Sequence, residues 1–147
     1  WWFALIAVVA GAFSLLNAML VMRLGMRRLV VAAMGLLIAL TSLMILLDLL
    51  VFPSGLPFAL YIFWQGAVFV HTAMTLGNLS ALAMEPMGAV AGMAASVITG
   101  LATVGAVVFT IPIGLAFDGT PLPLLTGVAF SVSLAFLLAK NIPNSAD

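Results

Sequence analysis

The chain has 147 residues, of which 66% are hydrophobic and only 5% are charged, and its mean hydropathy is +1.40. Its four basic and four acidic residues cancel to a net charge of zero, and it has no cysteine. Soluble domains are about 45–50% apolar and about 25% charged, so we expect the lipid bilayer to surround this protein. The composition excludes a disordered chain, a coiled coil, a secreted mini-protein and a nucleic-acid binder. The missing cysteines exclude disulfides and zinc–thiolate sites.

Charged residues and prolines divide the apolar sequence into five predicted membrane spans. A helix rises about 1.5 Å per residue and needs about 20 residues to cross a hydrocarbon core of about 30 Å. Lipid offers no hydrogen-bond partner to an open backbone, and the alternating polar positions of a membrane β-strand are absent. We therefore expect an all-α, polytopic transmembrane bundle. Its predicted spans are residues 1–22, 29–50, 58–84, 87–117 and 122–139.

The basic residues predict how the spans are oriented. Arg23, Arg27 and Arg28 form a cluster between the first two spans, and Lys140 follows the fifth. With five spans these two places share one side of the membrane, and the positive-inside rule makes that side cytoplasmic. The N-terminus is then outside and the C-terminus cytoplasmic. A chain that starts outside, with Trp1 in place of methionine, indicates part of a longer protein.

Polar side chains recur along one face of the third span, at helical spacing. Ionisable groups at membrane depth are costly and normally face the bundle or a wet cavity. His71 is the single histidine, and free histidine titrates near about pH 6.5, within reach of a proton-coupled switch. The alternative is a neutral His71 that only hydrogen-bonds a neighbouring helix. The candidate cavity-lining residues are Gln65, His71, Thr72, Thr75 and Asn78; for Gln65 and Asn78, a helix–helix hydrogen bond is an equal alternative.

The fourth span is rich in small residues. Gly88, Gly92, Ser96 and Gly100 recur at every fourth position, a pattern that lets helix backbones approach closely. We expect this row to form a helix-packing seam, either as plain packing or as a surface that slides during a conformational change. The second and fifth spans are almost purely aliphatic, and we expect both to face lipid.

Enzyme and cofactor motifs are absent from the sequence. It has no His-Glu-x-x-His metal motif, no Gly-x-Ser-x-Gly nucleophile elbow, no phosphate-binding loop and no dinucleotide fingerprint. Its acidic residues Asp48, Glu85 and Asp118 lie near span ends. We therefore expect a protein that is not an enzyme, with no catalytic residue, no metal site and no cofactor.

Two segments resemble a known transporter family. The run GNLSALAMEPMG at 77–88, followed by AGMAAS at 91–96, resembles the junction of transmembrane helices ten and eleven in the major facilitator superfamily. The likeness is to the bicyclomycin/chloramphenicol-resistance-type drug:proton antiporters. The run RLGMRR at 23–28 resembles the loop between helices eight and nine. It departs from the family pattern because Met22 replaces the acid and Met26 replaces an arginine, so the acid–helix latch of that loop is not implied.

The resemblance covers nearly the whole chain and implies that residues 1–147 are helices eight to twelve, part of the C-terminal half of a twelve-helix transporter. It implies a multi-pass protein of the bacterial inner membrane that exports drugs or other small organic molecules in exchange for protons, a function associated with multidrug resistance. The partners would be the lipid bilayer, a small-molecule substrate and protons. In the family, the proton-coupling acids lie in the N-terminal half, outside this sequence.

The sequence leaves three alternative functions open. The chain could belong to a major facilitator carrier of sugars, nucleosides or organic anions, because helices eight to twelve discriminate poorly among substrates. It could be a membrane scaffold or assembly subunit, in which the small-residue row serves helix association alone. A membrane enzyme is the last alternative.

Overall fold

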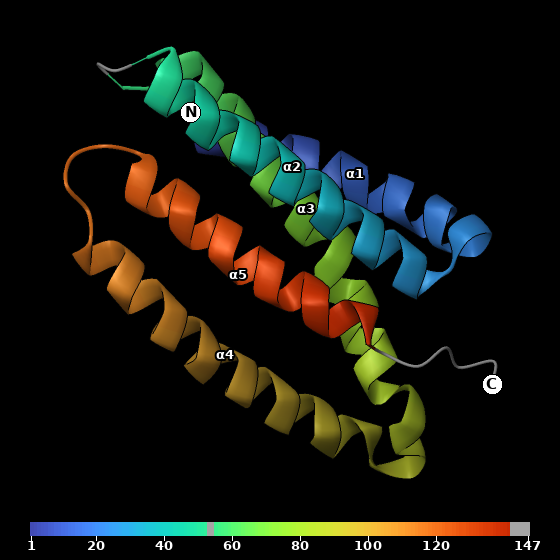
Figure 1. Cartoon of the computed structure of the whole chain (residues 1–147). Helices are drawn as coiled ribbons and strands as arrows, with labels where there is room; N and C mark the ends of the chain where they lie inside the picture. The colour runs from blue at the N-terminus through green and yellow to red at the C-terminus, as the bar shows by residue number, and fades with distance from the viewer. Residues whose placement is uncertain (53–54, 142–147) are drawn as a thin grey trace.

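The described residues form five α-helices and one short 3-10 helix. The structure, a computed structural model, describes residues 1–52 and 55–141; the predicted cytoplasmic C-terminus, at 142–147, lies outside them. No strand occurs among the described residues. In chain order the elements are α1 (Trp2–Leu24), α2 (Met26–Leu50), α3 (Phe58–Met84), η1 (Glu85–Val90), α4 (Ala91–Leu115) and α5 (Leu122–Lys140) (Figure 1).

The helices have the length and composition of membrane spans. Within the described residues, four continuous helical segments are long and apolar enough to cross a membrane: Trp2–Leu24, Met26–Leu50, Phe58–Leu115 and Leu122–Lys140. Together with the low charge content, these segments identify a membrane protein. The all-α class predicted from composition is therefore confirmed, with helices of the length and hydropathy that a membrane span needs, and the count of five spans stays a prediction.

The segment Phe58–Leu115 contains a sharp break. Pro86, which lacks a backbone N–H, lies in the first turn of η1, and Gly88 has a φ of +47° and a ψ of −122°. Glycine adopts such a backbone far more readily than residues with a Cβ. Residues 87–90, predicted to begin the fourth helix, instead belong to this 3-10 turn, and α4 runs back beside α5 (Figure 1).

Helix α2 has more buried residues than any other helix of the described chain. After the adjacent pair at 29 and 30, its buried residues recur at intervals of three or four and therefore lie on one side of the helix: Leu29, Val30, Met34, Leu37, Thr41, Met44 and Asp48. This side packs against α3 and α5. The prediction that the second span faces lipid is thus wrong for one of its sides. Thr41 and Asp48 lie on the packed side, but residues 29–40 are apolar on every side of the helix, so this stretch gave no pattern to show which face packs inward.

Two buried clusters join α2 to its neighbours. Val30 and Met34 pack with Ala139 of α5 at one end of the bundle. At the other end, Met44 packs with Trp64 of α3 and Leu125 of α5. The fifth helix therefore also has a packed side, which the sequence pattern did not predict.

One hydrogen bond lies inside the second cluster. Trp64 and Thr41 are both fully buried, and the indole Nε1–H donates to the Thr41 hydroxyl oxygen over 3.0 Å. A buried indole needs a partner for its N–H, and in hydrocarbon no solvent can supply one. This bond fixes the register of α3 against α2.

Helices α1 and α4 are far more open. Helix α1 buries only Ile6 and Ala10, and α4 buries no residue at all. Their apolar side chains remain uncovered by the described residues, as Leu101 and Val104 of α4 illustrate. The tightly packed part of the bundle is therefore α2, α3 and α5.

We expect Thr41→Val to destabilise the protein by about 1 kcal/mol, because it leaves the buried Trp64 N–H without an acceptor. Unfolding in mixed detergent micelles would measure the loss, and a double-mutant cycle with Trp64→Phe would isolate the pairwise energy. Thr126→Val is the matched control, since the exposed Thr126 hydroxyl bonds only to carbonyls of its own helix. Equal losses in the two valine variants, with no coupling in the cycle, would contradict this role.

Candidate functional site

The predicted polar face of α3 is divided between two neighbouring helices. Asn78 is buried and its Nδ2 donates to Oδ1 of Asn17 on α1 (2.9 Å) and to the carbonyl of Met74 (2.7 Å). Asn78 therefore makes the helix–helix hydrogen bond that was one of its two predicted roles. Its partner Asn17 belongs to α1, so the bond joins α3 to α1.

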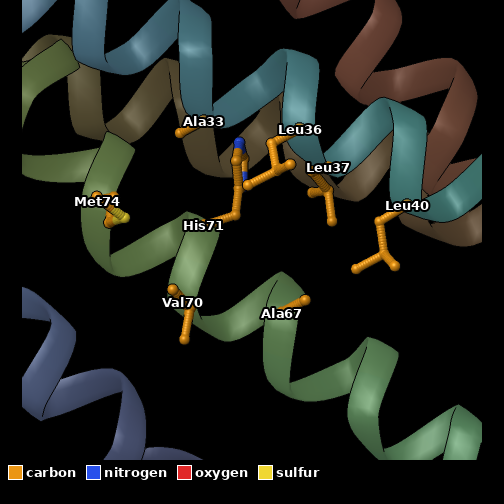
Figure 2. Close-up of a pocket in the computed structure, with 8 residues that line it drawn as sticks. All are labelled: Ala33, Leu36, Leu37, Leu40, Ala67, Val70, His71 and Met74. Carbon is orange, nitrogen blue, oxygen red and sulfur yellow. The ribbon is translucent and has the colours of Figure 1, made fainter.

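His71 points toward α2. Figure 2 shows its imidazole reaching from α3 to the side of α2 that carries Ala33 and Leu36. A cavity of about 110 Å³ surrounds it, and its other lining residues are all apolar. They are Ala33, Leu36, Leu37, Leu40, Ala67, Val70 and Met74.

Two polar atoms on α3 lack a partner. Within the described part of the chain, Nε2 of His71 and Oε1 of Gln65 are buried and make no hydrogen bond. An unpaired buried polar atom costs about 1–3 kcal/mol and is rare in native proteins. Of the two residues, His71 lines the cavity and Gln65 does not, so Nε2 of His71 is the atom that could bond a polar group held there.

The two threonines on the predicted polar face of α3 form hydrogen bonds within their own helix. The Thr72 hydroxyl donates to the carbonyl of Val68 (3.0 Å), and the Thr75 hydroxyl donates to the carbonyl of His71 (2.8 Å). Each hydroxyl oxygen still has lone pairs to accept a bond. Thr75 is buried whereas Thr72 is exposed, so Thr72 is the more accessible of the two.

A larger cavity lies among α2, α3, α4 and α5. Its volume is about 530 Å³, and His71 and Thr72 both line it. Its other polar lining residues are Thr110 and Ser131, whose hydroxyls donate to carbonyls of their own helices. No Asp, Glu, Lys or Arg lines it. The cavity can therefore hold an apolar molecule with few polar groups, and it offers no fixed charge to a charged one.

The small-residue row of α4 is open on its outer side. A Cβ added at Gly92 or Gly100 would meet no atom within 4 Å, and the Ser96 hydroxyl donates to the carbonyl of Gly92 (3.2 Å). Gly88, predicted as the first member of the row, lies in η1 and not on α4, because its positive φ interrupts the helix. No described helix packs into this row, so its role as a seam stays a prediction. The close approach of α4 lies elsewhere: a Cβ on Gly127 of α5 would come within 2.5 Å of Ile113.

The basic residues gather at one end of the bundle. The side chains of Arg27 and Arg28, at the start of α2, line a hollow together with Lys140, at the end of α5. Arg27 Nη2 donates to the carbonyl oxygen of Lys140 over 2.8 Å. Arg23, the third member of the predicted cluster, lies in the last turn of α1 and is not among the lining residues.

The acidic residues are dispersed. In 1–52 and 55–141, no three side chains of His, Asp or Glu come together in a way that could hold a metal ion. Asp48 is buried and its Oδ1 accepts the backbone N–H of Leu56 (2.9 Å), which closes the α2–α3 connection. Glu85 is exposed at the start of η1.

Comparison with known proteins adds no family to this description. No protein-family model, no curated protein and no solved structure matches the chain.

The turn between α4 and α5 contains a carboxylate with a perturbed pKa. Oδ1 of Asp118 accepts the Thr120 hydroxyl (2.6 Å) and the Thr120 backbone N–H (3.0 Å). Hydrogen bonds to the charged form lower the pKa of a carboxylate, and these lower the pKa of Asp118 below its ordinary 3.8, the hydroxyl having the larger effect. The turn is exposed and lies outside the helices.

We expect Thr120→Val to raise the pKa of Asp118 toward its ordinary value and Thr120→Ser to leave it low, because serine keeps the hydroxyl. The folded-state pKa is the lower one, so the stabilisation of this turn is fully present above the unfolded-state pKa. It is lost as the pH falls through the folded-state pKa. An NMR titration of the Asp118 carboxyl carbon would measure the shift; identical curves for the valine and serine variants would rule out the hydroxyl as its cause.

Proposed function

We propose that this chain forms helices eight to twelve of a major facilitator superfamily transporter that exports drugs or other small organic molecules in exchange for protons. The observation that carries the proposal is the unpartnered Nε2 of His71 on the central helix α3, beside the cavity of about 530 Å³. The resemblance of residues 77–88 and 91–96 to the helix ten–eleven junction of the drug:proton antiporters supports the same assignment.

In this proposal α3 and α4 are separate crossings, which makes five spans. The 58 residues from Phe58 to Leu115 would extend about 87 Å as one straight helix. That is nearly three times the hydrocarbon thickness of about 30 Å. The positive φ of Gly88 provides the reversal between two crossings of ordinary length.

The proposed orientation has Arg23, Arg27, Arg28 and Lys140 in the cytoplasm of a bacterial cell and Trp1 outside. The gathering of Arg27, Arg28 and Lys140 around one hollow supports a common side for these residues. By the positive-inside rule, that side is cytoplasmic. The Asp118 turn would then lie on the outer side.

Transport would proceed by alternating access, in which one half of the transporter rocks against the other around a site near the middle of the membrane. Helix α3 would supply substrate contacts through His71 and Thr72, which line the larger cavity. The open row of α4 would supply the moving surface. Proton coupling would depend on acidic residues outside this chain.

The lining of the larger cavity favours one substrate class over the alternatives. A sugar or nucleoside site needs many side-chain hydrogen-bond partners, and an organic-anion site needs a cation. The cavity has no cationic residue, and its hydroxyls already donate within their own helices. A largely apolar organic molecule with a single polar group that reaches His71 suits this lining.

We expect His71→Ala in the complete transporter to lower apparent substrate affinity by about threefold to tenfold, the equivalent of one hydrogen bond, and to change the pH dependence of efflux. No Asp, Glu, Lys or Arg lines either cavity at His71, so the His71 imidazole is the titratable group of both linings. Flux into proteoliposomes between about pH 5.5 and 8 would measure both effects. Ser133→Ala on α5 is the control, because Ser133 lines neither cavity. Unchanged affinity and pH profile for His71→Ala would overturn the assigned role.

We expect Gly92→Leu and Gly100→Leu to abolish transport while membrane insertion stays intact. Both positions are open among the described residues, so leucine fits this structure and would obstruct only a helix that packs against the row during transport. Met93→Leu, on the exposed side of the same turn, is the matched control. Full transport by both glycine variants would show that the row is not a moving seam.

A further inference from the structure

We propose that Arg28 and Lys140, together with Arg27, form a binding site for the phosphate headgroup of an anionic phospholipid. Arg27 and Arg28 lie at the start of α2, and Lys140 lies at the end of α5, 113 residues after Arg27 in the sequence. They line one hollow of about 430 Å³ whose remaining lining residues are Val31 and Ala32. This site is independent of the proposed transport function.

The site is held in place by packing and hydrogen bonding. The bond from Arg27 Nη2 to the Lys140 carbonyl oxygen ties the two helix ends together. Directly beneath it, Val30 and Ala139 belong to one buried cluster. The Lys140 ammonium lies 5.0 Å from the centre of the Phe136 ring, a cation–π distance that holds the charge in position.

The charge of the hollow selects an anion. Within residues 1–52 and 55–141, no ion pair joins Arg28 or Lys140 to an acidic side chain. The described carboxylates are engaged or placed elsewhere: Asp48 bonds Leu56, and Asp118 bonds Thr120. The planar guanidinium of arginine can donate two parallel hydrogen bonds to two phosphate oxygens, and the lysine ammonium adds a compact positive charge. Basic pockets between membrane helices are suited to anionic headgroups in the same way.

The apolar side of the hollow indicates a lipid and not a soluble phosphate. Arg28, Ala32 and Leu36 follow each other at intervals of four, so they lie along one face of α2. Ala32 lines the hollow, and Leu36, one turn deeper, is 74% exposed. When the phosphate of a phospholipid lies between Arg28 and Lys140, the acyl chains of the same lipid would therefore cover this exposed face of α2.

Titration of the full-length protein in detergent with phosphatidylglycerol, read by native mass spectrometry, tests the site. We expect saturable binding of phosphatidylglycerol, weaker binding of zwitterionic phosphatidylcholine, and no displacement by excess inorganic phosphate. Arg28→Gln and Lys140→Gln should each weaken phosphatidylglycerol binding about tenfold, the loss of one charge-assisted hydrogen bond. Arg28→Lys, which keeps the charge, should restore most of it.

Arg23→Gln is the matched control, because it removes the same charge five residues from Arg28 but outside the hollow. We expect it to change the affinity by no more than about twofold, since salt screens charges that do not touch the ligand. Equal losses for Arg23→Gln, Arg28→Gln and Lys140→Gln would overturn the site in favour of general attraction to the membrane surface. Displacement by inorganic phosphate would overturn the lipid as the ligand, and either result is obtained without measuring transport.

Discussion

Hydrocarbon offers no hydrogen-bond partner, and this constraint governs the arrangement of the bundle. A polar side chain at membrane depth must find its partner inside the protein. The Trp64–Thr41 bond joins α3 to α2, and the Asn78–Asn17 bond joins α3 to α1. Each of these bonds fixes one helix against α3 in both rotation and depth. Aliphatic contacts alone would permit several registers, because lipid tails are as apolar as the side chains that pack there.

The same constraint makes the unpaired polar atoms of α3 costly, because lipid cannot supply their missing partners. On helix α3, Trp64 and Asn78 each donate a hydrogen bond to a neighbouring helix, whereas Nε2 of His71 and Oε1 of Gln65 have no partner among the described residues. A helix selected for packing alone has no reason to retain them, since apolar residues of similar size avoid their desolvation cost. The contrast within a single helix is what links α3 to ligand binding in the proposed transporter.

Sequence patterns predicted some of these features and missed others for physical reasons. Length and hydropathy located the helices within a few residues, because helical backbone is obligatory in lipid. Pro86 signalled the end of α3, but Gly88 was assigned to the fourth helix, because the length of the 3-10 turn depends on the path of the chain and not on local propensity. The buried side of α2 was missed because Leu37 and Leu36 are the same residue type, one buried and the other exposed. The resemblance of residues 77–88 to the major facilitator superfamily stays a prediction, because no known protein matches the chain.

Packing divides the bundle into two parts of different character. Large side chains interlock between α2, α3 and α5, with Trp64 and Leu125 fully buried. Helix α4, by contrast, approaches α5 closely at Gly127 and presents its small-residue row outward. Interlocked side chains resist sliding because every displacement opens voids, whereas a row of glycines has no side chains to disengage. In the proposed transporter, α2, α3 and α5 would therefore move as one unit, and the outward row of α4 would be the surface along which a helix outside the described residues slides.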